Sequence, residues 1–248
     1  MPIKPYLSAS QYRRWLECPA AEYAAQTGQW TRPETDAMTK GKYVDIAILG
    51  GDMDAFLAAN PDMFSTRGER KGELKAAYAN LQRCIDRVGG EPKAMRLLTG
   101  EAHVAISGNL GGCDWIGELD CLPNDPDLDC YLTDLKKLKD FRPEWATIDG
   151  RNARLPWYER YWLQMAVYWH LTGRKRIPVL VAVTEQDPPG LKAVILGDES
   201  RLASEIADIE QHVPTILQWK SGAVEPSPCE SDDCAYCRGV MFKVEEAN

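Results

Sequence analysis

Three carboxylates and one ammonium occur at strand-like spacing in the middle of the chain. Glu118 and Asp120 lie in one strand-like run and Asp134 and Lys136 in the next, with a turn-rich segment, residues 123–127, between them. Because side chains two residues apart in a strand point to the same face, a hairpin of the two runs would gather all four. Oxygen ligands of this kind suit Mg²⁺ or Mn²⁺, and a lysine beside them can hold a phosphate or polarise an attacking water. This is the chemistry of phosphodiester hydrolysis, and the alternative is a pair of ordinary strands with polar, solvated outer faces.

A second group of reactive side chains lies near the C-terminus. Cys229, Cys234 and Cys237 are separated by four and two residues, and thiolates at such spacing suit zinc or an iron–sulfur cluster. Such sites usually have four protein ligands, and these cysteines supply three. Cys18, at the end of the first expected helix, is the natural fourth. The alternative is a reduced, cysteine-rich tail without metal. The other four cysteines are expected to be small buried apolar residues: Cys84, Cys113, Cys121 and Cys130.

Composition and charge narrow the class of protein. The 248 residues are 44% hydrophobic and 27% charged, as in a globular protein, and no run of about 18 apolar residues predicts a membrane span. Residues 1–5 lack the apolar core of a signal peptide, so we expect a cytoplasmic protein whose cysteines do not form a disulfide framework. The net charge of −8 argues against a simple basic nucleic-acid binder. Residues 134–160 nevertheless carry seven Lys/Arg against five acids.

The rest of the sequence predicts helices around a strand meander. Ser8 and Gln11 form a capping box, and Asp52 and Asp198 are further helix caps. Helices are expected over 8–18, 36–49, 52–59, 67–88, 156–172 and 198–220. Strands are expected over 101–107, 113–121, 129–136, 177–184 and 191–196, with a hairpin turn at 108–111 and an irregular loop over 142–155. This order predicts a mixed α/β domain with one sheet.

A set of short motifs follows this order of elements. Trp15-Leu16-Glu17-Cys18-Pro19 ends the first helix, and Gly41 and Asp45 lie in the second. They are followed by Glu101, Gly117-Glu118-Leu119-Asp120, Asp134-Leu135-Lys136, and the helical pair Gln164 and Tyr168. Over residues 8–240 this order resembles the PD-(D/E)XK nuclease superfamily, in the branch of RecB-type nuclease domains and RecE-like phage or prophage exonucleases. The resemblance implies a restriction-endonuclease-like core, with one central mixed β-sheet flanked by helices. It implies a single domain over residues 1–248, closed by the N-terminal helix and the cysteine-rich tail, residues 225–240.

The resemblance also implies roles for individual residues. Asp120 would bridge metal ions, Asp134 would be the second carboxylate ligand, and Lys136 would orient the nucleophilic water and stabilise the transition state. Gln164 and Tyr168, four residues apart on one helical face, would support the site and contact the scissile-strand phosphate. Glu101 would point into the site from a neighbouring strand.

One position departs from the pattern. The second helix carries Asp45 where the family usually has histidine. Aspartate can bind Mg²⁺ or Mn²⁺ directly, which makes Asp45 a third expected ligand, although the change also fits a weakened site or a shifted helix. His103 shares the expected strand face of Glu101 and is a further ligand candidate. His170 and His212 are expected to be helix-surface residues.

The function implied by the resemblance is a metal-dependent DNA exonuclease that acts at linear DNA ends in phage-type recombination or repair, with a possible single-strand annealing protein as partner. A catalytically weak DNA-end-binding or accessory protein on the same fold is the alternative, because of Asp45. A third hypothesis is an unrelated metal-binding scaffold. Relatives in this branch hold a [4Fe–4S] cluster with one N-terminal and three C-terminal cysteines. Cys18, Cys229, Cys234 and Cys237 are therefore expected to hold such a cluster, with zinc as the alternative.

Overall fold

Five strands of the chain form one mixed sheet in the order β1-β2-β3-β6-β7. The computed structural model describes residues 3–148 and 151–240. The strands of this sheet are β1 (Gly100–Leu110), β2 (Cys113–Pro123), β3 (Tyr131–Leu138), β6 (Ile177–Thr184) and β7 (Leu191–Ile195). Strand β3 is parallel to β6, while β2 pairs with β3 and β6 with β7 in antiparallel fashion. With the helices that pack on β3 and β6, this sheet confirms the predicted α/β class.

The chain divides into two compact units, to which β1 and β2 both contribute. The central unit comprises residues 34–106 and 118–202, and the terminal unit comprises residues 1–33, 107–117 and 203–248. Among the described helices, none combines the length and the apolar character that a membrane crossing requires.

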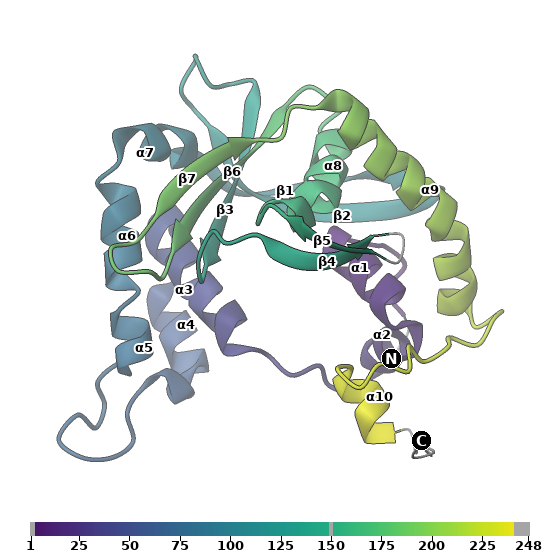
Figure 1. The fold of residues 1–248 in the computed structure, drawn as a ribbon, viewed down its shortest axis with the longest axis horizontal. Helices are drawn as coiled ribbons and strands as arrows, with labels where there is room; N and C mark the ends of the chain where they lie inside the picture. Colours follow the sequence, from purple (N-terminus) through teal and green to yellow (C-terminus); the bar gives the residue numbers. More distant parts are fainter. Residues whose placement is uncertain (1–2, 149–150, 241–248) are drawn as a thin grey trace. The chain divides into compact units, whose positions relative to one another are not determined.

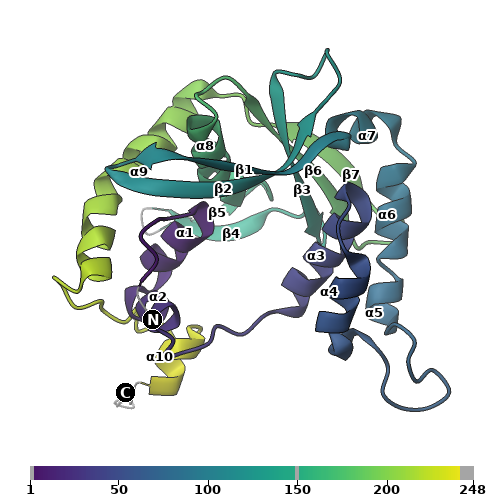
Figure 2. The same cartoon turned by 180° about the vertical axis from the view of Figure 1, so that it is seen from behind.

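The central unit is built on the buried strands β3 and β6. Its helices are α3 (Asp36–Leu49), α4 (Met53–Ala59), α5 (Ala76–Ala79), α6 (Gln82–Gly89), α7 (Pro92–Leu98) and α8 (Trp162–Leu171). Helices α3, α4 and α6 lie side by side in both views of the fold (Figures 1 and 2). Val44 of α3 and Val88 of α6 are buried in one apolar cluster with Leu135 of β3 and Val181 of β6. This packing holds the other face of β3, which carries Asp134 and Lys136, in a fixed position.

The terminal unit contains both ends of the described chain. Ser8 caps helix α1 (Ala9–Glu17), because its side chain accepts from the backbone N–H of Gln11, and Pro19 starts α2 (Pro19–Thr27). Most of the long helix α9 (Glu199–Ser221) and the short α10 (Ala235–Val240) follow in this unit. Trp15 of α1 is fully buried and stacks on Trp219 of α9 with ring centroids 6.1 Å apart.

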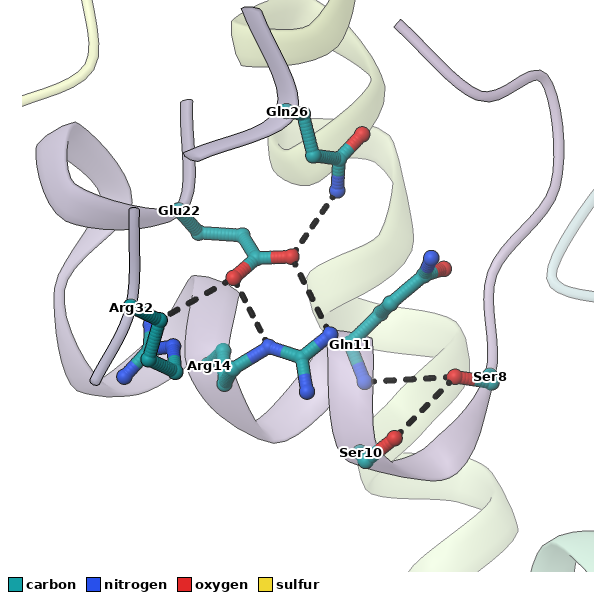
Figure 3. Close-up of polar contacts among 7 residues, drawn as sticks. All are labelled: Ser8, Ser10, Gln11, Arg14, Glu22, Gln26 and Arg32. Atoms are coloured by element: carbon teal, nitrogen blue, oxygen red, sulfur yellow. Dashed lines mark hydrogen bonds and ion pairs between the residues drawn. The ribbon is translucent and has the colours of Figure 1, made fainter. Parts of the chain in front are cut away.

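A buried carboxylate joins the helices of the terminal unit. Glu22 is 2% exposed and accepts from Arg14 Nε at 2.8 Å and from Gln26 Nε2 at 2.9 Å (Figure 3). Arg32 Nη2, in the segment after α2, lies 3.4 Å from the same carboxylate. Glu22 therefore connects α1, α2 and the chain that leaves them.

We expect Glu22→Ala to lower the free energy of unfolding by about 1–3 kcal/mol, because it removes a buried acceptor of charged hydrogen bonds. Urea denaturation followed by circular dichroism measures this loss. Glu17→Ala is the matched control, because Glu17 is an exposed glutamate of α1, and it should change stability by no more than about 0.5 kcal/mol. Equal stability of the two variants would contradict the role given to Glu22.

Some predicted elements differ from the structure. The helix predicted over 67–88 is wrong, because Gly68 and Gly72 have positive φ (73° and 87°), and residue 65 bonds back to residues 72 and 73. Only the separate helices α5 and α6 remain of it, and α7 was not predicted. The hairpin turn lies at Gly111 and Gly112, whose φ values are 63° and 77°, and not at 108–111. Cys130 is exposed, not buried.

The segment after β3 also differs. Residues 142–155, expected as a loop, contain the antiparallel strands β4 (Glu144–Ile148) and β5 (Arg151–Leu155). The helix expected over 156–172 begins at Trp162, after a short 3₁₀ turn, Glu159–Tyr161. Pro156, at the start of this stretch, disfavours a helical conformation in the residue before it.

Candidate active site

Asp120 lies beside the short pairing of β2 with β3. Its neighbours in β2, Leu119 and Cys121, are fully buried, and Cys121 is opposite Thr133 of β3. Asp120 Oδ2 accepts a hydrogen bond of 2.7 Å from the backbone N–H of Leu135. The side chain of Asp120 thus accepts the hydrogen bond that a carbonyl of a neighbouring strand would normally accept from this amide. The bond directs the carboxylate toward β3.

Asp134 and Lys136 share one face of β3, opposite Leu180 and Ala182 of the parallel strand β6. Asp134 is 0% exposed, and its Oδ2 lies 2.5 Å from Lys136 Nζ. The ammonium of Lys136 is therefore its counter-charge.

Helix α8 supports this carboxylate from a second element. Gln164 Nε2 donates to Asp134 Oδ1 at 3.2 Å and to the Tyr168 hydroxyl at 2.8 Å. The helix is anchored because Met165, next to Gln164, and Trp169, next to Tyr168, are buried. The structure therefore brings together Asp120, Asp134, Lys136, Gln164 and Tyr168, all in the central unit.

Burial and charge perturb the titration of these groups. Burial raises the pKa of Asp120 well above its usual range, and the neighbouring charge of Asp134 adds to this effect. Burial also raises the pKa of Asp134, while Lys136 opposes the rise. Burial alone would lower the pKa of Lys136, but the charges of Asp134 and Asp120 outweigh it and the pKa is raised. Lys136 is therefore a firmly protonated ammonium among carboxylates that are costly to ionise.

Asp45, on α3, faces the same group of charges. Burial raises its pKa, the charges of His103 and Lys136 lower it, and that of Asp134 raises it again. Its Oδ2 lies 3.9 Å from Nε2 of His103, whose Nδ1 is 3.5 Å from Glu118 Oε1. His103, a lesser candidate from sequence, thus lies between Asp45 and Glu118.

Glu101 and His103 do not follow simple alternation along β1. His103 has a φ of 53°, in the left-handed region, so the two-residue repeat of side-chain direction is interrupted at this residue. Glu101 is an exposed residue of β1. The expectation that both side chains share one strand face therefore loses its geometric basis.

Tyr161 is a neighbour of the site that the sequence did not indicate. Its ring centroid lies 5.3 Å from Lys136 Nζ, within the range of a cation–π contact. Burial raises the pKa of its hydroxyl, and the charge of Lys136 lowers it. The only available signal was its place in an aromatic-rich stretch before α8.

The donor set fits a divalent cation in its chemistry. Asp45, Asp120 and Asp134 supply three carboxyl groups beside the single ammonium of Lys136 in a largely buried place, and carboxylate oxygens are the ligands that Mg²⁺ and Mn²⁺ prefer. Among the residues that the structure describes, however, these carboxylates do not come together as a preformed group of metal ligands.

Comparison with known proteins places this arrangement in a family. The model of one family, described as a PDDEXK-like domain of unknown function (DUF3799), matches residues 8–240. The chain belongs to this PDDEXK-like family. It is therefore a member of the PD-(D/E)XK nuclease superfamily, as the order of its motifs predicted, and its sheet has the restriction-endonuclease-like arrangement.

One solved structure agrees with this membership. The crystal structure of a protein from Eubacterium rectale, provisionally named an exonuclease, matches this PDDEXK-like chain with a TM-score of 0.85 and 25% identity, over 98% of this chain and 91% of that chain. The structure of SSO0001 gives a TM-score of only 0.39 and 13% identity over 85% of this chain and 78% of that chain. No curated protein matches the sequence.

The terminal unit of this PDDEXK-like protein holds the four predicted cysteines together. Cys18 lies at the break between α1 and α2, and the ligand atoms of Cys18, Cys229, Cys234 and Cys237 all lie within 4.8 Å of one another. Cys237 Sγ is 3.6 Å from Cys18 Sγ and 3.7 Å from Cys229 Sγ. Figures 1 and 2 both show α10 beside α2, which accounts for this meeting of distant segments. The group could hold a metal ion.

The sulfur spacing bears on which metal would fit. Four thiolates at about 2.3 Å from one tetrahedral ion lie about 3.8 Å from each other. The distances of 3.6 and 3.7 Å are close to this value. The thiolates of a four-iron cluster each bind a different iron and must lie farther apart.

Proposed function

We propose that this protein is a metal-dependent DNA exonuclease that hydrolyses phosphodiester bonds. The observation that carries the proposal is the buried Asp134–Lys136 pair beside Asp120, in a chain of the PDDEXK-like family. The likeness to a protein provisionally named an exonuclease supports the exonuclease and DNA parts of the proposal.

In this proposal Asp45, Asp120 and Asp134 hold Mg²⁺ or Mn²⁺. The ion, when bound, supplies Lewis-acid activation of the phosphate and of water. Lys136 orients the water and offsets the negative charge that develops on the phosphate, and Gln164 holds Asp134 in position. Tyr168 lies beside the scissile phosphate. The role of Glu101 stays a prediction.

End-labelled linear DNA, single-stranded and duplex, tests the proposed function. Incubation with Mg²⁺ or Mn²⁺ should release short products from the ends, whereas EDTA should prevent release and covalently closed circular DNA should resist. Linear DNA that stays intact with either ion would contradict exonuclease activity.

A DNA-end-binding protein without turnover is the second candidate. Asp45, in place of the histidine that the family resemblance leads one to expect, favours it. It predicts retention of linear DNA in a gel shift, with no cleavage at any concentration of Mn²⁺.

For the cysteine group we propose a structural role with one tetrahedral ion, zinc, as the favoured occupant. The sulfur distances support this choice over the iron–sulfur cluster expected from the resemblance. Burial raises the pKa of Cys18 to about 12, so a bound cation is needed to keep this thiol ionised.

Asp45→Ala should raise the Mg²⁺ or Mn²⁺ concentration needed for half-maximal cleavage, by about tenfold or more, because one carboxylate ligand is lost. Asp45→His should keep activity with Mn²⁺. Titration of bound Mn²⁺ by electron paramagnetic resonance measures affinity without turnover. Asp54→Ala, an exposed aspartate of α4, is the control. An Asp45→Ala protein with unchanged Mn²⁺ affinity would remove Asp45 from the ligand set.

Two broader expectations stay predictions. A role in phage-type recombination with a single-strand annealing protein can be tested by co-purification from infected cells. We also propose that the two units make up one nuclease domain, which a family model spanning residues 8–240 supports.

A further inference from the structure

The strand that carries Lys136 continues into an open groove of the central unit. This groove has a volume of about 920 Å³. Lys137, Leu138 and Lys139, which directly follow Lys136 along the chain, line it, as does Tyr161. Because the Tyr161 ring also contacts Lys136, the groove begins at the candidate active site.

A second hollow, of about 480 Å³, adjoins the first. Glu144 and Arg160 line both, and their side chains are joined by an ion pair of 3.2 Å. The second hollow is also lined by Trp145 of β4 and Arg201. The two hollows therefore meet at the Glu144–Arg160 pair.

The two hollows together form one path, and Trp145 stands out among the side chains that line it by its exposure. It is 72% exposed, more than any other large hydrophobic side chain in the described part of the chain. It lies opposite Arg154 of β5, whose guanidinium carbon is 5.7 Å from the indole centroid. A short two-stranded ribbon thus presents a flat aromatic ring with a cation beside it, and neither belongs to the apolar core.

The charge on the path is mildly positive in a chain of net charge −8. Six basic and five acidic side chains line the two hollows. Each of the five acids is ion-paired with one of these bases. Lys139 remains without an acidic partner among the described residues, and Arg154 adds a charge at the ribbon. This path would therefore not repel a polyanion, but its small positive charge would bind phosphate groups only weakly.

We propose that one unpaired nucleic-acid strand lies along these two hollows, with a base stacked on Trp145 and the backbone beside Arg154 and Lys139. The inference rests on the proposed function and specifies how its substrate is held. Stacking requires the free face of a base, which a paired duplex offers only at its two ends. The strand leads past Tyr161 to Lys136, so the ribbon orients substrate that reaches the active site.

Fluorescence anisotropy in EDTA tests the inference without turnover. The probe is a labelled oligodeoxythymidine of about 16 nucleotides. Trp145→Ala should weaken its binding by about 5- to 150-fold, the loss expected for one stacked base, while Trp145→Phe should keep most of it. Arg154→Ala should weaken binding less. Inorganic polyphosphate should compete poorly, and affinity should fall with salt at a slope of only about −1 to −2.

Matched controls exclude general effects of the substitutions. Ile195→Ala removes another exposed apolar side chain, on β7, and Arg174→Ala removes another arginine that lies over a tryptophan. Both should bind the oligonucleotide as the wild type does. All variants should give wild-type circular dichroism spectra, because the replaced side chains are exposed.

Failure of the inference differs from failure of the proposed function. Wild-type binding by Trp145→Ala, equal affinity for a blunt duplex, or full displacement by polyphosphate would each overturn the inference, even if the enzyme cleaves DNA. Loss of binding by Trp145→Ala in a protein that cleaves nothing with Mg²⁺ or Mn²⁺ would support the inference and contradict the exonuclease.

Discussion

Replacing Lys136 with alanine should lower the rate of metal-dependent phosphodiester hydrolysis by about 10²–10³-fold and leave the fold in place. The ammonium lies 2.5 Å from Asp134 and its pKa is raised, so it is charged throughout the neutral range. Its interaction with the phosphate strengthens as negative charge develops, so the loss should fall on kcat more than on KM. Single-turnover digestion of end-labelled DNA measures it directly.

Lys175→Ala is the control for this prediction, because Lys175 is an exposed lysine of the same unit. It should cleave at the wild-type rate, and a Lys136→Ala protein that does the same would show that the site is assigned wrongly.

Asp120→Asn separates the charge of Asp120 from its structural role. The amide oxygen can still accept from the Leu135 N–H, but the negative charge next to Asp134 is gone. Cleavage should be abolished. The melting temperature in EDTA should stay the same or rise by a few degrees, because a buried charge repulsion is removed.

The shared face of Asp134 and Lys136 on β3 could be predicted from the sequence because strand alternation is local. The two-residue repeat of a strand is enough to place Asp134 and Lys136 on one face. One helical turn is enough to place Gln164 beside Tyr168. The bond from Asp120 to the Leu135 amide depends on how β2 meets β3, which no local pattern encodes. The contact of His103 with Asp45 likewise joins a strand to a helix far away in the sequence. His103 also has a left-handed backbone conformation inside its strand, which strand alternation does not predict.

The two misassigned segments have different physical causes. Residues 67–88 have helix-forming composition, but Gly68 and Gly72 adopt positive φ and the chain folds back on itself. The β4–β5 ribbon is short, and its strands, Glu-Trp-Ala-Thr-Ile and Arg-Asn-Ala-Arg-Leu, lack the regular alternation of polar and apolar residues that predicts a strand. The prediction of an irregular loop there therefore missed the two-stranded ribbon that presents the exposed Trp145.

Replacing Cys18 with serine should remove the metal from the terminal unit and destabilise it by on the order of several kcal/mol. The four thiols come from segments more than 200 residues apart in sequence, since Cys18 Sγ meets Cys237 Sγ at 3.6 Å with a separation of 219. A metal that closes so long a loop restricts the unfolded chain and contributes its binding free energy to folding. A serine hydroxyl is a poor substitute, because it is not ionised at neutral pH.

Metal analysis and thermal unfolding of the purified protein measure this effect. Wild-type protein should be colourless and contain about one zinc per chain. Cys18→Ser should contain much less and unfold at lower temperature. Cys130→Ser, which changes an exposed cysteine of the central unit, should match the wild type in both respects.

Two other results would change the assignment in different ways. Brown protein with about four irons per chain would keep the four ligands and replace zinc by an iron–sulfur cluster, which would require the sulfurs to move apart from their present spacing. Metal-free wild-type protein with freely titrating thiols at all four positions would remove the metal site. The small apolar cluster around Cys18, Ala21 and Cys237 would then be left as the contact between α2 and the C-terminal segment. That cluster has few buried residues, so apolar packing contributes little stability there. This is the physical reason to expect that a bound metal contributes the rest.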